Sequence, residues 1–76
     1  MRIMGGGRMD LEKLKSEMRD RSITIDELAR RANIERSALY RRFNSGGKKL
    51  TVAEARSISE ALGLAPETVM SIFFEQ

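Results

Sequence analysis

The motif Thr-x-x-Glu occurs twice in this chain of 76 residues, once at Thr24 and Glu27 and once at Thr51 and Glu54. In such a capping box the threonine hydroxyl accepts a hydrogen bond from the backbone N–H three residues on, while the glutamate reaches back to the threonine N–H. Each motif therefore predicts where a helix begins. The first of these helices is expected to end at Asn33, a residue type that tolerates the left-handed conformation of a sharp turn, and the second just before Gly63.

Three further helices are predicted from apolar spacing and from start and stop signals. Asp10 suits the N-cap of a helix that ends near residues 21–22, and a basic helix is expected from about residue 35 to residue 43 or 44. Pro66 fits the first turn of a short last helix that ends at residue 73 or 74. No stretch alternates in the period of a strand, so the predicted fold class is all-α, a compact five-helix bundle. The inward-facing side chains are expected to be Leu11, Leu14, Met18, Leu28, Ala29, Ala32, Leu39, Phe43, Ala55, Ile58, Leu62, Val69, Ile72 and Phe73.

The chain is predicted to hold one domain, residues 9–76, preceded by an arm of residues 1–8. The arm contains three consecutive glycines and no apolar period, which is typical of a flexible segment. Alternatively, Arg2 and Arg8 make it a basic arm that reaches along a nucleic acid.

The composition argues against several classes of protein. The chain has no cysteine and no histidine, so it lacks disulfides, thiolate metal sites and the commonest general base. We therefore expect no enzyme, no metal or other cofactor and no small-molecule ligand. No apolar run approaches the roughly 20 residues of a membrane span, and nothing resembles a secretory signal. A cytoplasmic protein without a membrane partner is expected.

The positive charge is concentrated in the middle of the chain. The net charge is zero over residues 1–29, +6 over residues 30–49 and −3 over residues 50–76. The middle segment holds seven of the 14 basic side chains, and its one acid is Glu35. An ordinary solvated surface usually mixes the two signs, whereas a positive patch attracts polyanions. The distribution favours a nucleic acid as the partner.

A tight turn between two short helices, of which the second is basic, is typical of the helix-turn-helix arrangement. On a helical wheel of residues 35–44, Leu39 and Phe43 share one side and can anchor the helix on the core. The opposite side is polar and carries no acid, and arginine there can fork onto the edge of guanine. We predict Arg36, Ser37, Tyr40 and Arg41 to read bases, and Thr24, Arg42, Asn44, Ser45, Lys48 and Lys49 to bind phosphates. Tyr40 either contacts a sugar or a thymine methyl group or lies along the helix with its hydroxyl in water.

Residues 10–73 resemble the Cro-type (XRE, lambda-repressor-like) helix-turn-helix domains of phage and bacterial regulators. The resemblance rests on TIDELARRANIERSALYRRF and LTVAEARSISEALGLAPETV. These segments are similar to the family's Thr-x-x-Glu-Leu-Ala-x-x-x-Gly-Ile/Val-Ser-x-x-x-Ile pattern and to its closing helix pair. The resemblance implies that the helix with Arg36, Ser37, Tyr40 and Arg41 enters the major groove of double-stranded DNA. It further implies a sequence-specific transcriptional regulator, and a phage or prophage-type repressor is the simplest form for so short a chain.

The sequence departs from the family's pattern at three positions. Ile25 stands where the family often has a glutamine that helps to hold a phosphate, Asn33 replaces the turn glycine, and Glu35 replaces the serine or threonine that caps the third helix. We expect Glu35 to complement the helix N-terminus or to pair with Arg31 or Arg36, rather than to accept from a cytosine amine.

The last helix is apolar on two sides. Val69, Ile72 and Phe73 form one stripe, and Met70 and Phe74 form a second. In a small protein the second stripe suggests a surface for a partner, so we predict a homodimer interface at Met70, Phe73 and Phe74. The alternative is a monomer in which Phe74 folds back onto the first helix.

A second function stays open on the sequence alone. In this alternative the chain is a helical interaction module, such as an adaptor or an antitoxin-like partner, whose basic face binds an acidic protein.

Overall fold

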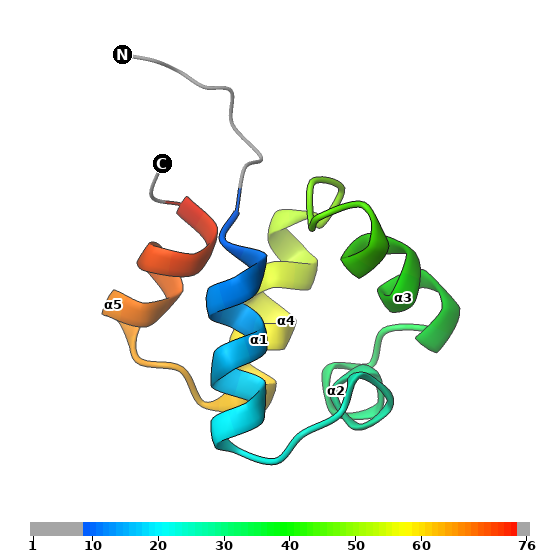
Figure 1. The fold of residues 1–76 in the computed structure, drawn as a ribbon, viewed down its shortest axis with the longest axis horizontal. Coiled ribbons are helices and arrows are strands. Elements are labelled where there is room, and N and C mark those ends of the chain that lie inside the picture. Colours follow the sequence, from blue (N-terminus) through cyan, green and yellow to red (C-terminus); the bar gives the residue numbers. More distant parts are fainter. Residues whose placement is uncertain (1–8, 75–76) are drawn as a thin grey trace.

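The computed structural model of the protein describes residues 9–74, and this part of the chain contains helices and short connections but no strand. The elements are α1 (Leu11–Asp20), α2 (Ile25–Ala32), α3 (Arg36–Asn44), α4 (Val52–Leu62), α5 (Pro66–Val69) and a π-helical turn, η1 (Met70–Phe74). In Figure 1, α1 crosses in front of α4, with α5 on one side of this pair and α2 and α3 on the other. The prediction of an all-α, five-helix fold is confirmed, while the predicted arm, residues 1–8, lies outside the described residues.

Most of the predicted helix ends carry the expected local contacts. Thr51 and Glu54 form a complete capping box at the start of α4, and the Asp10 carboxylate accepts from the Lys13 N–H at 3.0 Å at the start of α1. Gly63 follows α4 with φ of 67°, the left-handed conformation that lets the chain reverse without a steric penalty. These ends depend on residues a few positions apart, which is why the sequence alone predicts them.

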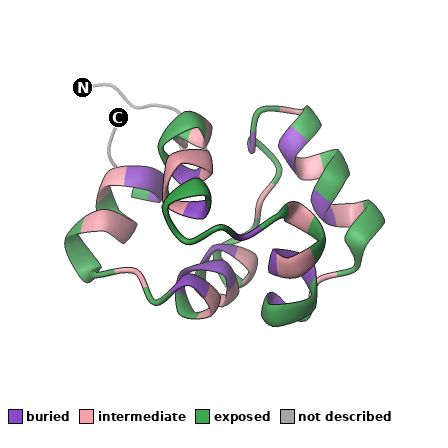
Figure 2. Ribbon diagram, turned by 60° about the horizontal axis from the view of Figure 1, so that its bottom comes forward, coloured by how far each residue is buried: buried purple, intermediate pink, exposed green. Residues whose placement is uncertain are grey.

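A single apolar core lies between the helices. Leu14, Leu28, Leu39, Ile58 and Ile72 are completely buried, and together they come from α1, α2, α3, α4 and η1. Buried residues line the sides of the helices that face one another, whereas the outer sides are exposed (Figure 2). Burying a side chain of this size stabilises the fold by about 1.5–3 kcal/mol. The predicted inward faces are confirmed, with Leu11 and Val69 only partly buried at the edge of the core.

The end of the chain differs from the single short helix predicted from the sequence. After α5, residues 70–74 form a π-helical turn, whose i→i+5 hydrogen bonds make it wider than an α-helical turn. Because a π-helical turn rotates less per residue about its axis, the side chains of the neighbours Ile72 and Phe73 point in more similar directions. Both of them are buried. The carbonyl of Ile72 accepts from the Asp10 N–H at 2.7 Å, which ties the start of α1 to this turn.

The start of α1 also contacts the connection between α3 and α4. Gly47 in this loop has φ of 81°, and a Cβ atom at this position would overlap the Met9 side chain. Glycine is favoured at position 47 by the left-handed backbone, and a larger residue would also require the flexible end of the Met9 side chain to move aside. The Met9 side chain thus lies against the loop that carries Lys48 and Lys49.

Candidate nucleic-acid interface

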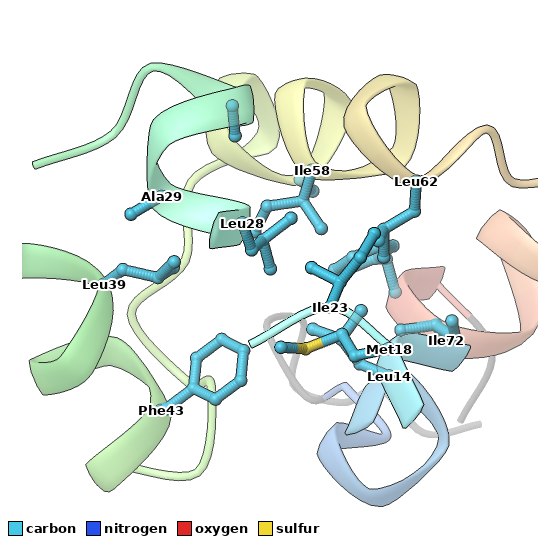
Figure 3. Close-up of a cluster of buried hydrophobic side chains, with 13 residues drawn as sticks. Leu14, Met18, Ile23, Leu28, Ala29, Leu39, Phe43, Ile58, Leu62 and Ile72 are labelled. Atoms are coloured by element: carbon cyan, nitrogen blue, oxygen red, sulfur yellow. The ribbon is translucent and has the colours of Figure 1, made fainter. Parts of the chain in front are cut away.

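Helices α2 and α3 form a two-helix unit with a tight turn. Asn33 ends α2 with φ of 59° and ψ of 43°, and the Ile34 N–H donates to the Ala29 carbonyl at 2.9 Å. Leu39 and Phe43 point from α3 into the core (Figure 3) and are buried there. The predicted turn and the predicted anchors of the second helix are confirmed.

The outer side of α3 carries the residues that we predicted to read bases. Arg36, Ser37, Tyr40 and Arg41 are all exposed, as is Asn44 one turn further on. Within residues 9–74, Arg41 takes part in no ion pair. The helix therefore presents a guanidinium fork, a hydroxyl and an amide on one accessible side, which are groups that match base edges in the major groove.

A carboxylate of α2 lies among these groups. The Asp26 Oδ1 atom is 3.4 Å from Arg36 Nε and accepts a hydrogen bond from the Tyr40 hydroxyl at 3.1 Å. The Arg36 guanidinium also lies 5.9 Å from the centre of the Tyr40 ring. The outer side of α3 itself is free of acids, as predicted, but the surface around it is not. The Tyr40 hydroxyl is bonded to Asp26 and is not free in water.

The second acid of α2 binds two arginines of its own helix. Glu27 accepts from Arg30 and from Arg31 Nε, the latter at 2.9 Å, and these bonds lower the pKa of Glu27, with Arg31 as the larger cause. Thr24 Oγ1 accepts from the Glu27 N–H at 3.1 Å, so half of the predicted capping box at this helix is present. The predicted return of the Glu27 side chain to Thr24 is wrong, because the two arginines engage its carboxylate.

Glu35 makes no ion pair within the described residues. The predicted pairing with Arg31 or Arg36 is wrong, since Glu27 and Asp26 bind those two guanidinium groups. Glu35 occupies the N-cap position of α3 without a side-chain cap bond. A negative charge at this end of a helix is favourable, so the predicted electrostatic role is consistent with its position.

Arg42 is engaged within the protein. Its Nε and Nη2 atoms donate to the two carboxylate oxygens of Glu54 at 3.1 and 3.2 Å, a fork that joins the last turn of α3 to the first turn of α4. The hydrogen bond from Arg42 is the largest cause that lowers the pKa of Glu54, and the Thr51 N–H adds to it. Arg42 therefore has a structural partner that we did not predict when we assigned it to a phosphate.

The other predicted phosphate-binding residues lie at the ends of α2 and α3. Thr24, Asn44, Lys48 and Lys49 are exposed, and Ser45 is half-buried with its hydroxyl donating to the Arg42 carbonyl at 2.9 Å. Neither lysine makes an ion pair within residues 9–74. The positive charge of the middle segment that no acid compensates within residues 9–74 therefore belongs to Arg41, Lys48 and Lys49, together with one charge left over where the single carboxylate of Glu27 binds both Arg30 and Arg31.

The second apolar stripe of the last helix is on the surface. Met70 and Phe74 are 51% and 47% exposed, and Val52 at the start of α4 is 73% exposed beside them. Val52 and Phe74 border a groove of about 290 Å³ between α4 and the C-terminal turn. Phe73, in contrast, is buried in the core, so of the three residues predicted for a dimer interface it has the least surface to offer.

The described part of the chain offers neither a membrane-spanning helix nor a metal site. None of its helices has the length and apolar character needed to cross a membrane. Residues 9–74 also contain no cluster of three or more acidic side chains placed to hold a metal ion.

The family of the chain follows from its comparison with protein-family models. The model of the Cro/C1-type HTH DNA-binding domain matches residues 13–75, which is most of the chain. The chain belongs to this family. Searches of curated proteins and of solved structures gave no match. The resemblance noted in the sequence is confirmed, and the protein is a Cro/C1-type DNA-binding protein whose partner is double-stranded DNA.

Sequence reasoning missed Asp26 in this Cro/C1-type domain. The residue was regarded only as part of a capping motif, although it lies ten positions before Arg36 and on the neighbouring helix. A sequence signal existed, because Asp26 lies two residues after Thr24, which we had already assigned to a phosphate contact. The contacts of Asp26 with α3 and the pair of Arg42 with Glu54 are features of the interface that the structure adds to the sequence prediction.

Proposed function

We propose that the protein is a sequence-specific transcriptional regulator, of the phage or prophage repressor type, that places α3 in the major groove. The observation that carries the proposal is the exposed polar side of α3, held on the core by Leu39 and Phe43 in a Cro/C1-type two-helix unit. Repression then follows from occlusion of a promoter. This is a binding function in the cytoplasm, and it needs no enzymatic activity.

In this proposal the base-reading residues are Arg36, Ser37, Tyr40 and Arg41. Arg41 is the readiest of them, because it has no acidic partner within residues 9–74. Its guanidinium can fork onto guanine O6 and N7, a contact that discriminates against other bases by about 1–3 kcal/mol. The contacts to phosphates are assigned to Thr24, Asn44, Ser45, Lys48 and Lys49. Arg42 is assigned to the fold, since Glu54 binds it.

A selection from a pool of randomised duplexes tests the proposal. The wild-type protein is expected to enrich one short motif, and Arg41→Ala is expected to enrich a motif that is relaxed at one base pair. Lys49→Ala serves as the matched control, because it also removes one exposed positive charge but leaves the enriched motif unchanged. If the folded wild-type protein enriches no motif, the proposal fails, and an interaction module for an acidic protein becomes the better account.

We also propose a homodimer through the C-terminal surface formed by Val52, Met70 and Phe74. Arg56 and Glu60 lie one turn apart on α4 and line the groove beside Phe74, and neither makes an ion pair within residues 9–74. A two-fold axis that passes between these two residues places each arginine opposite the glutamate of the other copy, which makes the surface self-complementary in charge as well as apolar.

The dimer is tested by sedimentation of the wild-type protein and of Phe74→Ser. We expect the wild type to sediment as a dimer and the variant as a folded monomer. In the duplex selection, a dimer is expected to give two half-sites about one helical turn apart. A wild-type protein that stays monomeric at concentrations of about 0.1 mM and on its selected duplex contradicts this part of the proposal.

A further inference from the structure

The three side chains Asp26, Arg36 and Tyr40 form one cluster on the surface that is proposed to face DNA. Asp26 contributes the only carboxylate of the cluster and contacts both other members, with Arg36 Nε at 3.4 Å and the Tyr40 hydroxyl at 3.1 Å. Arg36 and Tyr40 are in turn within cation–π distance of each other. An acid thus lies next to two of the four residues assigned to base reading.

The geometry of the cluster makes Asp26 a competitor for Arg36. The side chains of Arg36 and Asp26 are 69% and 54% exposed. In so exposed an ion pair, the paired state is favoured over the separated state by at most about fivefold. A correctly placed guanine favours its arginine by about fivefold to a hundredfold over other bases. The carboxylate can therefore be displaced by a matching base, but it repels every phosphate that approaches.

Asp26 differs in this respect from its neighbour Glu27. Glu27 binds Arg30 and Arg31, which belong to its own helix, so its charge is used within α2. Asp26 reaches across the turn to α3, and its contacts therefore determine what the recognition helix offers to DNA.

We propose that Asp26 is a specificity-determining residue: it occupies Arg36 in the free protein and thereby weakens binding to non-cognate duplex. On random DNA, Asp26 keeps Arg36 from contacting a phosphate, and the carboxylate stays close to the DNA backbone. On a cognate site, a base pair replaces Asp26 as the partner of Arg36. The inference rests on the proposed function, since it needs α3 to face the major groove.

The test is a double-mutant cycle of Asp26 and Arg36. In this cycle the association constant K for duplex of random sequence is measured by fluorescence anisotropy at several salt concentrations. Asp26→Asn frees Arg36 for a phosphate, so the dependence of log K on log salt is expected to steepen by about 0.9. Extrapolated from 1 M to 0.1 M salt, one additional phosphate contact corresponds to about eightfold tighter binding. In the Arg36→Ala background, Asp26→Asn removes only the repulsion between the carboxylate and phosphates, so its effect on both quantities is expected to be clearly smaller than in the wild-type background.

Two further variants separate a specific role from a general effect of charge. Glu67→Gln removes one carboxylate from α5, which lies on the opposite side of α1 and α4 from α3 (Figure 1), and is expected to leave random-duplex binding unchanged. Asp26→Glu keeps a carboxylate that can reach Arg36, and it is expected to bind random duplex almost as weakly as the wild type does. A duplex selection with Asp26→Asn is expected to enrich the same motif as the wild type, with about eightfold less discrimination.

The inference is overturned if Asp26→Asn leaves the salt dependence unchanged, or if it tightens binding equally in the Arg36→Ala background. It is also overturned if Asp26→Asn alters the enriched motif in that background, because Asp26 would then read a base itself. The proposed function is tested separately: it fails if the wild-type protein enriches no motif in the duplex selection. Even then, binding to random duplex still measures the competition between Asp26 and phosphate for Arg36.

Discussion

Replacing Glu54 with glutamine tests whether Arg42 belongs to the fold rather than to the DNA contacts. The change removes the carboxylate that receives two hydrogen bonds from Arg42, at 3.1 and 3.2 Å, but leaves an oxygen that can accept from the Thr51 N–H. A hydrogen bond to a charged group contributes about 1.5–3 kcal/mol when buried, and an exposed ion pair at most about 1 kcal/mol. The side chains of Arg42 and Glu54 are 24% and 20% exposed, between these limits. We expect a loss of about 1–2 kcal/mol, or about 5–15 °C in Tm for a domain of this size.

The loss should depend on pH in a definite direction. Arg42 holds the pKa of Glu54 below its ordinary value of 4.5 in the folded protein. A carboxyl group with a lowered folded pKa stabilises the fold at pH values above its unfolded pKa, and this stabilisation is lost as the pH falls through the folded pKa. The difference in stability between wild type and Glu54→Gln is therefore expected to be constant near neutral pH and to shrink below about pH 4.5.

Thermal unfolding followed by circular dichroism at pH 7 and pH 3 measures both effects. Glu12→Gln is the matched control, because Glu12 also lies in the first turn of a helix. Its side chain is 83% exposed, and its contact with Lys15 is a loose one, with 4.0 Å between the charged atoms. Arg42→Met removes the guanidinium and keeps an apolar stem, and its coupling energy with Glu54→Gln is expected to be about 1 kcal/mol at pH 7. The reasoning is refuted if Glu54→Gln keeps the wild-type Tm at pH 7 while Arg42→Met makes the salt dependence of duplex binding shallower by about 0.9. Arg42 would then bind a phosphate.

Three further predictions concern the loop after α3 and the anchor of that helix. Lys48→Ala is expected to weaken binding to all duplexes alike and to reduce the salt slope by about 0.9, measured by anisotropy; a changed motif would instead mean base contact. Gly47→Ala is expected to cost about 1–2 kcal/mol, because φ is 81°, while the flexible end of the Met9 side chain can move away from the new Cβ. Gly46→Ala, with φ of 78° and open space, should cost a similar amount of about 1 kcal/mol, and no loss for either variant in urea unfolding would argue against the left-handed backbone of this loop. Leu39→Ala is expected to cost about 2–5 kcal/mol, since Leu39 is fully buried, and a loss below about 1 kcal/mol would contradict its place in the core.

The helices and their ends could be predicted from the sequence because their causes are local. Thr51 finds its partner Glu54 three residues away, and the left-handed conformation of Asn33 and Gly63 depends mainly on the residue itself. The periodicity that buries Leu39 is likewise a property of one helix. The widening of the last turn could not be predicted, because it accompanies the burial of two neighbouring side chains and a backbone contact with α1.

The partners of the charged side chains could not be predicted, for a physical reason. Glu27 had several donors within reach, and its choice of Arg30 and Arg31 over the backbone of Thr24 depends on small differences between exposed contacts. Asp26 meets Arg36 only because the turn brings α2 and α3 together. The net charge of +6 over residues 30–49 is therefore a poor measure of the positive charge that DNA would meet.

The contacts of α3 also determine which of its positions a protein engineer can vary. Residues 39, 42 and 43 are committed to the core and to α4, so a library that randomises them would yield mostly unfolded chains. Positions 37, 41 and 44 are exposed, and within residues 9–74 they make no side-chain bond to another element. Randomising these three positions, while Asp26 is kept, is the economical way to retarget the domain to a new duplex sequence.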